Sequence, residues 1–134
     1  MGTETQMRKT AKILVVEDDA SFLKALGDRL RRDGFLVEEA LDGEEGLRLA
    51  LENRPDLVLL DLRLPKMDGA EMMQKLREDK WGTDVPIIIL TNYDRDEEGF
   101  RDIMRNKPSY YLLKLENPLS EVVLKVKEVL GISS

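Results

Sequence analysis

The chain has 134 residues, with 42% hydrophobic and 36% charged side chains and a formal net charge of −6. This length and composition predict one globular domain with a core of ordinary size, rather than a disordered or membrane-embedded protein. Cysteine and histidine are both absent, which excludes disulfides, thiolate metal sites, cysteine nucleophiles and imidazole bases. The negative charge argues against direct binding of nucleic acid, so any phosphate chemistry rests on carboxylates, hydroxyls and lysines.

The amino-terminal residues MGTETQMRKTAK are polar and contain no hydrophobic stretch of the kind found in signal peptides. No apolar run approaches the roughly 18 residues that a membrane span needs. We therefore expect a cytoplasmic protein without membrane contact. Residues 1–11 are expected to form a flexible tail, and residues 12–131 a single domain.

In the first half of the chain, apolar runs alternate with amphipathic segments. Residues 13–16 (ILVV) are continuously apolar, which is typical of a strand buried on both faces of a parallel sheet. An amphipathic segment follows and ends at Gly34, which we expect to stop a helix. Residues 35–39 are more mixed and predict an edge strand before a second helix. The residues expected to face the core from these two helices are Phe22, Leu23, Leu26 and Leu30, then Leu47, Ala50 and Leu51.

The second half of the chain repeats the alternation. LVLL at residues 57–60 and IIIL at residues 87–90 predict two more buried strands, and residues 109–113 predict a second edge strand. The core-facing residues expected in its three helices are Met72, Met73 and Leu76, then Phe100, Ile103 and Met104, and finally Leu119, Val122, Val123, Val126 and Leu130. The whole pattern predicts an α/β fold, a doubly wound sheet of five parallel strands flanked by five helices.

Chemically useful side chains follow the predicted central strands, at the sheet edge where ligands of open parallel sheets bind. Glu17, Asp18 and Asp19 follow the first strand, Asp61 the third, Thr91 the fourth and Lys114 the fifth. If the first and third strands are neighbours, Glu17, Asp18 and Asp61 converge. Like charges about 4 Å apart repel by about 1 kcal/mol in water and by about 4 kcal/mol at an effective dielectric constant of 20, so this arrangement needs a cation.

Magnesium fits the predicted cluster, because Mg²⁺ keeps waters and takes only one or two carboxylates, whereas no D-x-D-x-D-G loop indicates calcium. With Mg²⁺ bound, an aspartate can act as a nucleophile and become an acyl phosphate. A lysine and a threonine hydroxyl would then stabilise the phosphoryl oxygens. Taken singly, Asp19 and Asp68 are better explained as helix N-caps, and Thr91 and Lys114 as turn or surface residues. Their joint placement at the strand ends favours phosphoryl transfer.

Four segments of the chain resemble the receiver domains of two-component response regulators. They are ILVVEDD at residues 13–19, LLDLRLPKMDG at residues 59–69, IIILTN at residues 87–92 and YLLK at residues 111–114. The resemblance implies the flavodoxin-like, CheY-like fold with strand order 2-1-3-4-5. It also implies that Asp61 is the phosphoacceptor in a phosphorelay and that Mg²⁺ is the cofactor.

The resemblance further implies how the metal is held. Asp18 and Asp61 would bind Mg²⁺ directly, and Glu17 would bind it through a water molecule. The backbone carbonyl of Arg63 would supply another ligand. No residue is assigned to an organic cofactor.

Three more residues receive roles from the same resemblance. Lys114 would contact the phosphoryl group, and Thr91 would be the switch hydroxyl. Tyr111 would rotate inward when Thr91 moves toward the phosphate. Phosphorylation would in this way change the conformation of a partner-binding surface elsewhere on the domain.

The phosphoryl donor is expected to be another molecule, because the chain has no histidine of its own. A sensor histidine kinase or a histidine phosphotransfer protein is the expected partner, acting upstream of an unidentified protein effector. A phosphorylation-dependent homodimer is a further expectation. The domain would catalyse only its own phosphorylation and dephosphorylation, so we do not expect it to be an enzyme.

Two stretches depart from the pattern of the family. Its lysine is usually followed by proline through a cis bond, but Lys114 is followed by Leu115. A cis bond before leucine costs about 2.5–4 kcal/mol, so we predict a trans bond and a reshaped loop. Asn117 and Pro118 then read as the N-cap and first residue of the last helix. The second departure, residues 106–109 (NKPS) in place of a Gly-Ala turn, affects the neighbouring surface.

Arg63 and Tyr93 lie two residues beyond Asp61 and Thr91, at positions that the resemblance places beside the phosphate. Bulky side chains there would hinder an attacking water and lengthen the lifetime of the acyl phosphate. Two other functions stay open. One is a receiver-like docking module that is not phosphorylated. The other is a phosphatase with an Asp nucleophile, although such enzymes commonly need a second acid at the position of Arg63. A nucleotide- or flavin-binding domain is disfavoured, because neither G-x-x-x-x-G-K-[ST] nor G-x-G-x-x-G occurs.

Overall fold

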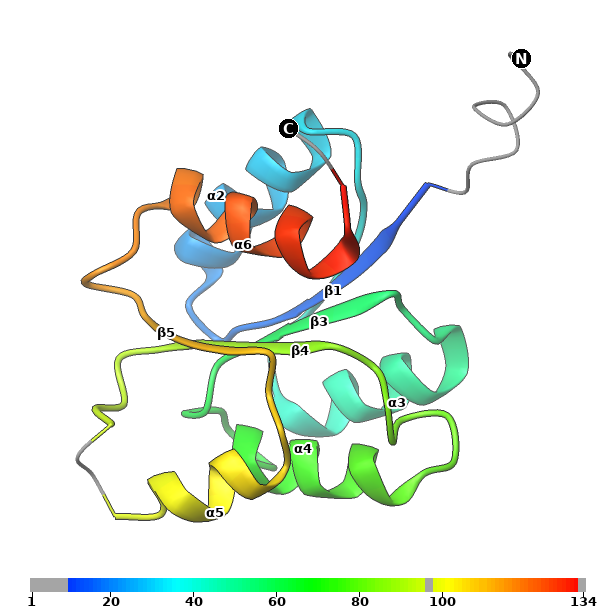
Figure 1. The fold of residues 1–134 in the computed structure, drawn as a ribbon, viewed down its shortest axis with the longest axis vertical. Helices are drawn as coiled ribbons and strands as arrows, with labels where there is room; N and C mark the ends of the chain where they lie inside the picture. The colour runs from blue at the N-terminus through cyan, green and yellow to red at the C-terminus, as the bar shows by residue number, and fades with distance from the viewer. Residues whose placement is uncertain (1–9, 96–97, 133–134) are drawn as a thin grey trace.

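The computed structural model describes residues 10–95 and 98–132, which form one parallel sheet covered by helices on both faces (Figure 1). The strands are β1 (Lys12–Val16), β2 (Leu36–Ala40), β3 (Leu57–Leu60), β4 (Ile87–Thr91) and β5 (Tyr110–Leu113), and their order in the sheet is β2-β1-β3-β4-β5. The helices are α2 (Ala20–Arg32), α3 (Gly43–Asn53), α4 (Gly69–Glu78), α5 (Phe100–Arg105) and α6 (Leu119–Leu130). The predicted doubly wound fold and its strand order 2-1-3-4-5 are confirmed.

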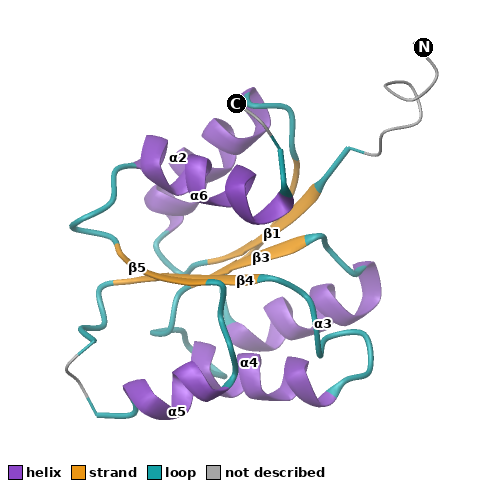
Figure 2. Cartoon of the chain, viewed as in Figure 1, coloured by secondary structure: helices purple, strands orange, loops and turns teal. Residues whose placement is uncertain are grey.

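The core consists of two layers, one on each face of the sheet. Helices α2 and α6 cover one face, and α3, α4 and α5 cover the other (Figure 2). Alternate side chains of a strand point to opposite faces, so Ile13 and Val15 pack with α2 and α6 while Leu14 and Val16 pack in the other layer. The central strands are buried on both faces, which explains the continuous apolar runs at residues 13–16, 57–60 and 87–90.

The register of the central strands aligns the ends that carry polar residues. Val16 of β1 is opposite Leu60 of β3, and Leu60 is in turn opposite Ile89 of β4. Glu17 and Asp61, the next residues along β1 and β3, therefore leave the sheet side by side. The parallel topology thus gathers these side chains at one edge of the sheet.

Helix ends follow the capping signals in the sequence. The side chain of Asp19 accepts hydrogen bonds from the backbone amides of Ser21 (3.0 Å) and Phe22 (3.1 Å), and so caps α2. Asp68 caps α4 in the same way. Gly34, at φ 97°, follows the end of α2 in the left-handed conformation that glycine tolerates best. The predictions for these three residues are confirmed.

Some predicted details differ from the structure. Residues 1–9 of the expected tail lie outside the described residues, and the carbonyl of Ala11 accepts a hydrogen bond from the amide of Leu36 (3.0 Å). Met104 and Leu51, expected in the core, are exposed. Met104 lies on the short helix α5, which buries Ile103 instead, and α3 turns Ala50 inward. Within the described residues, none of the helices is both long and apolar enough to cross a membrane.

Candidate functional site

Three carboxylates lie together beyond the carboxyl ends of β1 and β3. Carboxylate oxygens of Glu17, Asp18 and Asp61 are within 4.8 Å of one another. Glu17 and Asp61 are only 3% and 6% exposed, whereas Asp18 faces solvent. The predicted convergence of these residues is confirmed, and the cluster has two buried members and one open side.

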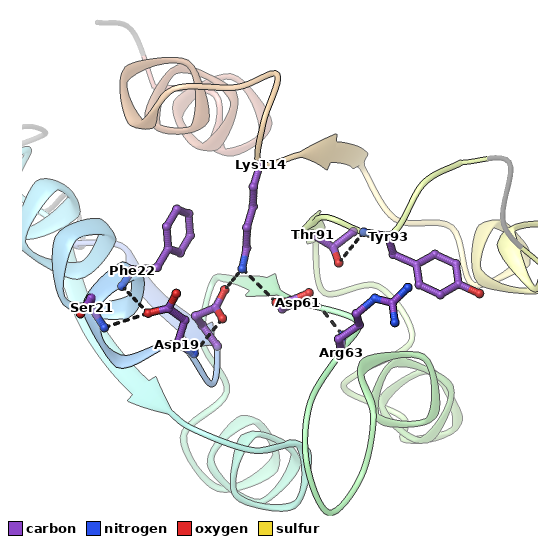
Figure 3. Close-up of polar contacts among 9 residues, drawn as sticks. Asp19, Ser21, Phe22, Asp61, Arg63, Thr91, Tyr93 and Lys114 are labelled. Carbon is purple, nitrogen blue, oxygen red and sulfur yellow. Dashed lines mark hydrogen bonds and ion pairs between the residues drawn. The ribbon is translucent and has the colours of Figure 1, made fainter.

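Lys114, at the end of β5, extends across the site toward two of these carboxylates (Figure 3). Its Nζ is 2.5 Å from Oε1 of Glu17 and 3.0 Å from Oδ2 of Asp61. The ammonium also lies 4.6 Å from the centre of the Phe22 ring, which shields it from water on one side and favours the cation. One lysine therefore offsets part of the repulsion between the two buried acids.

The electrostatics of the site follow from burial and pairing. Burial raises the pKa of Glu17, and its hydrogen bonds with Lys114 and with the amide of Asp19 only partly oppose that rise. Burial alone would lower the pKa of Lys114, but hydrogen bonds to Glu17 and Asp61 outweigh it and raise the pKa above its usual value. Lys114 is thus firmly protonated, and its ammonium pairs with both buried carboxylates.

This donor set suits a metal ion. Hard divalent cations prefer oxygen ligands, and three carboxylates from neighbouring strand ends supply them within a small volume. The exposed side chain of Asp18 leaves room for waters on the metal. The cluster can therefore bind a metal. The expected ligand at the backbone of Arg63 stays a prediction, although the Arg63 amide donates to Oδ1 of Asp61 at 3.3 Å and folds the loop beside that carboxylate.

The predicted switch residues lie on the far side of Asp61, on β4 and β5. Thr91 is fully buried, and its Oγ1 accepts a hydrogen bond from the amide of Tyr93 (3.2 Å). Tyr111 is buried too, and its hydroxyl donates to the carbonyl of Tyr93 (2.6 Å). Its ring meets Phe100 edge-on, with centroids 5.0 Å apart. Tyr111 already lies inward, and its rotation stays a prediction.

Arg63 and Tyr93 are in contact with each other. The guanidinium carbon of Arg63 lies 4.8 Å from the centre of the Tyr93 ring, beside Asp61 in Figure 3. Both residues were expected near the phosphate, but their pairing was not predicted, since no local pattern relates residues 30 positions apart. Phe22 was likewise expected only as a core residue, yet it touches Lys114.

The loop after Lys114 is the first stretch where the sequence departs from the receiver pattern. Its Lys114–Leu115 bond is trans, as predicted, because the described residues contain no cis peptide bond. Leu115 is 91% exposed. The prediction that Asn117 caps the last helix is wrong by one residue. Pro118 is the N-cap, with its carbonyl accepting from the backbone amide of Val122 (3.1 Å). The side-chain amide of Asn117 instead donates to the carbonyl of Leu113 (2.9 Å).

Arg77, which was not singled out from the sequence, holds the turn at residues 106–109 where the chain also departs from the receiver pattern. The Arg77 guanidinium donates to the carbonyls of Asn106 (2.8 Å) and Lys107 (3.2 Å), and also to those of Gly82 (2.8 Å) and Val85 (2.7 Å). Lys107 has a left-handed backbone, with φ 56°. Arg77 therefore connects the end of α4 to the turns before β4 and β5.

A family model for the response regulator receiver domain matches residues 13–124. The chain belongs to this family. The receiver domain is 38% identical over 121 residues to the alkaline phosphatase synthesis transcriptional regulatory protein PhoP of Bacillus subtilis, a match that covers 89% of the chain and 48% of PhoP. It is 35% identical over 119 residues to the transcriptional regulatory protein PrrA of Mycobacterium tuberculosis, covering 89% of the chain and 49% of PrrA.

Solved structures agree with this assignment. The receiver domain matches a CheY-like response regulator receiver protein from Methanospirillum hungatei with a TM-score of 0.83 and 26% identity, over 92% of this chain and 95% of that one. It also matches the receiver domain of the sensor histidine kinase PA1611 from Pseudomonas aeruginosa, with a TM-score of 0.82 and 28% identity over 92% and 99% of the two chains. The PA1611 structure has a magnesium ion coordinated in its active site cleft.

The receiver domain spans about half or less of the length of these curated relatives. Several of them are named as transcriptional regulators. The family match shows a receiver domain of the two-component type, and the structure shows an acidic cluster that could hold a metal ion.

Proposed function

We propose that this receiver domain accepts a phosphoryl group on Asp61 from the phosphohistidine of a sensor histidine kinase or a histidine phosphotransfer protein. A carboxylate oxygen of Asp61 attacks phosphorus, the phosphorus–nitrogen bond breaks, and its electron pair returns to the imidazole of the donor. The observation that supports this most directly is the position of Asp61, nearly buried beside Lys114 and within 4.8 Å of two other acids. Positive charge placed beside Asp61 in this way would stabilise the negative charge of a transferred phosphoryl group.

Glu17, Asp18 and Asp61 would hold a magnesium ion, with the backbone carbonyl of Arg63 as a further ligand. Bound Mg²⁺ supplies charge neutralisation for the phosphoryl oxygens. The exposure of Asp18 and the oxygen-only donor set favour Mg²⁺, which keeps waters, over a closed calcium cage. The magnesium ion in the related PA1611 receiver structure supports the same choice.

Lys114 and Thr91 would bind the transferred group. The Lys114 ammonium is already 3.0 Å from Asp61 and would exchange that contact for a phosphoryl oxygen. The Thr91 hydroxyl now accepts from the Tyr93 amide, and turning toward the phosphoryl group would release that amide. Because the Tyr93 carbonyl accepts from Tyr111, this change reaches the surface around β5.

In this proposal the domain is a switch rather than an enzyme, since it modifies only itself and turns over no metabolite. The exchange takes place in the cytoplasm, and the altered surface binds a protein effector or a second copy of the chain. The relatives named as transcriptional regulators support a role for the whole protein in transcription. The net charge of −6 on this chain opposes direct binding of nucleic acid. Such binding would then belong to residues beyond the receiver domain.

The test is phosphorylation by acetyl phosphate and Mg²⁺, followed by mass spectrometry of the intact protein. We expect the wild type to gain one phosphoryl group and Asp61→Asn to gain none. Asp19→Asn is the matched control, because Asp19 is a neighbouring acid that caps α2, and it should be labelled like the wild type. Labelling of Asp61→Asn would contradict the site. A wild type that stays unlabelled by acetyl phosphate and by histidine donors would favour the docking module instead.

A further inference from the structure

The loop between β3 and α4, residues 62–68, forms one wall of the site. It begins directly after Asp61 and contains Arg63, whose carbonyl is a metal ligand in the proposed function. Within the loop, the amide of Met67 donates to the carbonyl of Pro65 (2.7 Å), and Lys66 between them has φ 68°. A lysine in this left-handed conformation persists only where neighbouring structure holds it there.

Helix α3 supplies that neighbouring structure, although it contributes no side chain to the site. The amide of Gly43, its first residue, is 3.4 Å from the carbonyl of Pro65. The side chain of Asp42, the N-cap of α3, lies 3.6 Å from Nζ of Lys66. The long hydrogen bond and the ion pair at the surface are both weak. Close packing between the start of α3 and the loop is therefore the stronger constraint on the loop.

The packing is closest at Gly43, which leaves no space for a side chain. A Cβ atom at this position would lie 1.8 Å from the carbonyl oxygen of Met67 and 2.7 Å from its carbonyl carbon. Both atoms belong to the backbone, so no rotamer change relieves the overlap. Any larger residue at position 43 must displace either the loop or the start of α3.

We propose that Gly43 is a positioning residue for the magnesium site. Its contact with Met67 sets the path of the β3–α4 loop, and with it the place of the Arg63 carbonyl relative to Asp61. The other end of the loop is fixed separately, by the hydrogen bond from the Gly69 amide to the Leu62 carbonyl (2.8 Å). This inference rests on the proposed function, because it assumes that Mg²⁺ binds at the acidic cluster.

The experiment compares Gly43→Ala with the wild type by titration of Mg²⁺, followed through backbone amide signals in NMR spectra. We expect Gly43→Ala to bind Mg²⁺ about tenfold more weakly, the loss typical when a group behind the metal ligands is changed. Before any metal is added, the amide signals of Arg63 and Met67 should already differ from those of the wild type. A merely destabilising substitution would not produce this local signature.

Two control variants separate positioning from general damage. Ala50→Gly lowers the stability of α3 without adding an atom near the loop, and should bind Mg²⁺ like the wild type. Gly27→Ala places a Cβ 2.6 Å from Oε2 of Glu39, the end of a flexible side chain that can move, and should also have no effect. Equal weakening of Mg²⁺ binding by Ala50→Gly would overturn the inference.

The remaining outcomes also decide the question. A folded Gly43→Ala with wild-type Mg²⁺ affinity and unchanged loop signals would overturn the inference. If Gly43→Ala does not fold, the wild-type titration decides: Mg²⁺ should shift the Gly43 amide together with the loop, but not that of Arg54 at the far end of α3. Failure of the wild type to bind Mg²⁺ would overturn the metal assignment itself, whereas the metal-free spectra of the variant would still show whether Gly43 sets the loop.

Discussion

Glu17 is a buried acid whose pKa is shifted by opposing effects. Burial raises its pKa, and the ammonium of Lys114 at 2.5 Å opposes that rise without cancelling it. The ionised carboxylate is therefore tolerated rather than favoured when no metal is present. A cation bound at the cluster would favour the ionised form of Glu17, as expected for a metal site.

The first prediction concerns the pH dependence of the metal-free domain. Because the folded-state pKa of Glu17 lies above the ordinary value of 4.5, the unfolded chain loses this proton first as the pH rises. The free energy of unfolding of the wild type, relative to that of Glu17→Gln, should therefore fall as the pH rises from 4.5 to the raised pKa. Below and above this range, the difference between the two proteins should not change with pH. Urea unfolding of both proteins across this pH range, in chelator, measures the difference.

Addition of Mg²⁺ provides the control for this pH effect. A bound cation favours the ionised carboxylate, so saturating Mg²⁺ should abolish the relative loss in the wild type. Glu17→Gln should respond less to the metal. A stability difference that does not vary with pH would contradict the raised pKa of Glu17.

The second prediction concerns Arg63 and Tyr93, which pair over the site by a cation–π contact at 4.8 Å. The paired side chains should hinder a water molecule from attacking phosphorylated Asp61. We expect Arg63→Ala with Tyr93→Ala to shorten the lifetime of the acyl phosphate several-fold, measured as loss of the phosphoryl group after the donor is removed. Each single variant should have most of the effect, because either change breaks the pair. An unchanged lifetime in the double variant would remove this role.

At the scale of elements, Arg77 connects the end of α4 to a nearby turn at residues 82–85 and to a distant turn at residues 106–107. Its guanidinium donates to four backbone carbonyls, of which those of Asn106 and Lys107 belong to the turn before β5. Burial lowers the pKa of Arg77, but the group stays protonated at any physiological pH. The turn of residues 106–109 therefore depends on a side chain from α4.

The third prediction follows from this network. Arg77→Ala should lower the free energy of unfolding by about 3 kcal/mol, because several charge-assisted hydrogen bonds are lost and carbonyls are left without partners. Arg77→Lys should recover less than half, since an ammonium cannot reproduce the planar fork. Urea denaturation measures both. Arg105→Ala, which removes an exposed pair with Asp102, is the control and should change stability by less than about 1 kcal/mol.

The elements themselves were largely predictable from local pattern. The strands at residues 57–60 and 87–90 are marked by continuous apolarity, and the caps at Asp19 and Asp68 by residue type and position. Helix α5 was also predicted, but its six residues contain too few turns to define its buried face fully. The exposure of Met104 is the result.

At the scale of the whole molecule, the candidate site combines residues from both ends of the chain. Its acidic members could be predicted from sequence because each directly follows a strand, and the topology brings those strand ends together. The contacts of Arg63 with Tyr93 and of Gly43 with Met67 could not, since they depend on how separate loops pack. The position of the site in the fold was thus predictable, but the contacts between the loops around it were not.

The fourth prediction concerns the response of the whole domain to a phosphate mimic. Beryllofluoride with Mg²⁺ binds only the folded state, so a ligand at 100 times its dissociation constant should stabilise the domain by about 2.7 kcal/mol. For a domain of this size, the thermal midpoint should rise by roughly 10 °C. Asp61→Asn should show no such rise. Size-exclusion chromatography of the same samples tests whether a homodimer forms, and an equal rise in Asp61→Asn would contradict binding at Asp61.

Lys114 follows β5, the last strand of the chain, and β5 pairs only with β4 at the edge of the sheet. During biosynthesis, Glu17, Asp18 and Asp61 all leave the ribosome long before this lysine. A nascent chain that has formed β1, β3 and β4 therefore contains the acids without their counter-ion. If Lys114 binds the phosphoryl group as proposed, this intermediate gains that cation only once β5 has docked against β4.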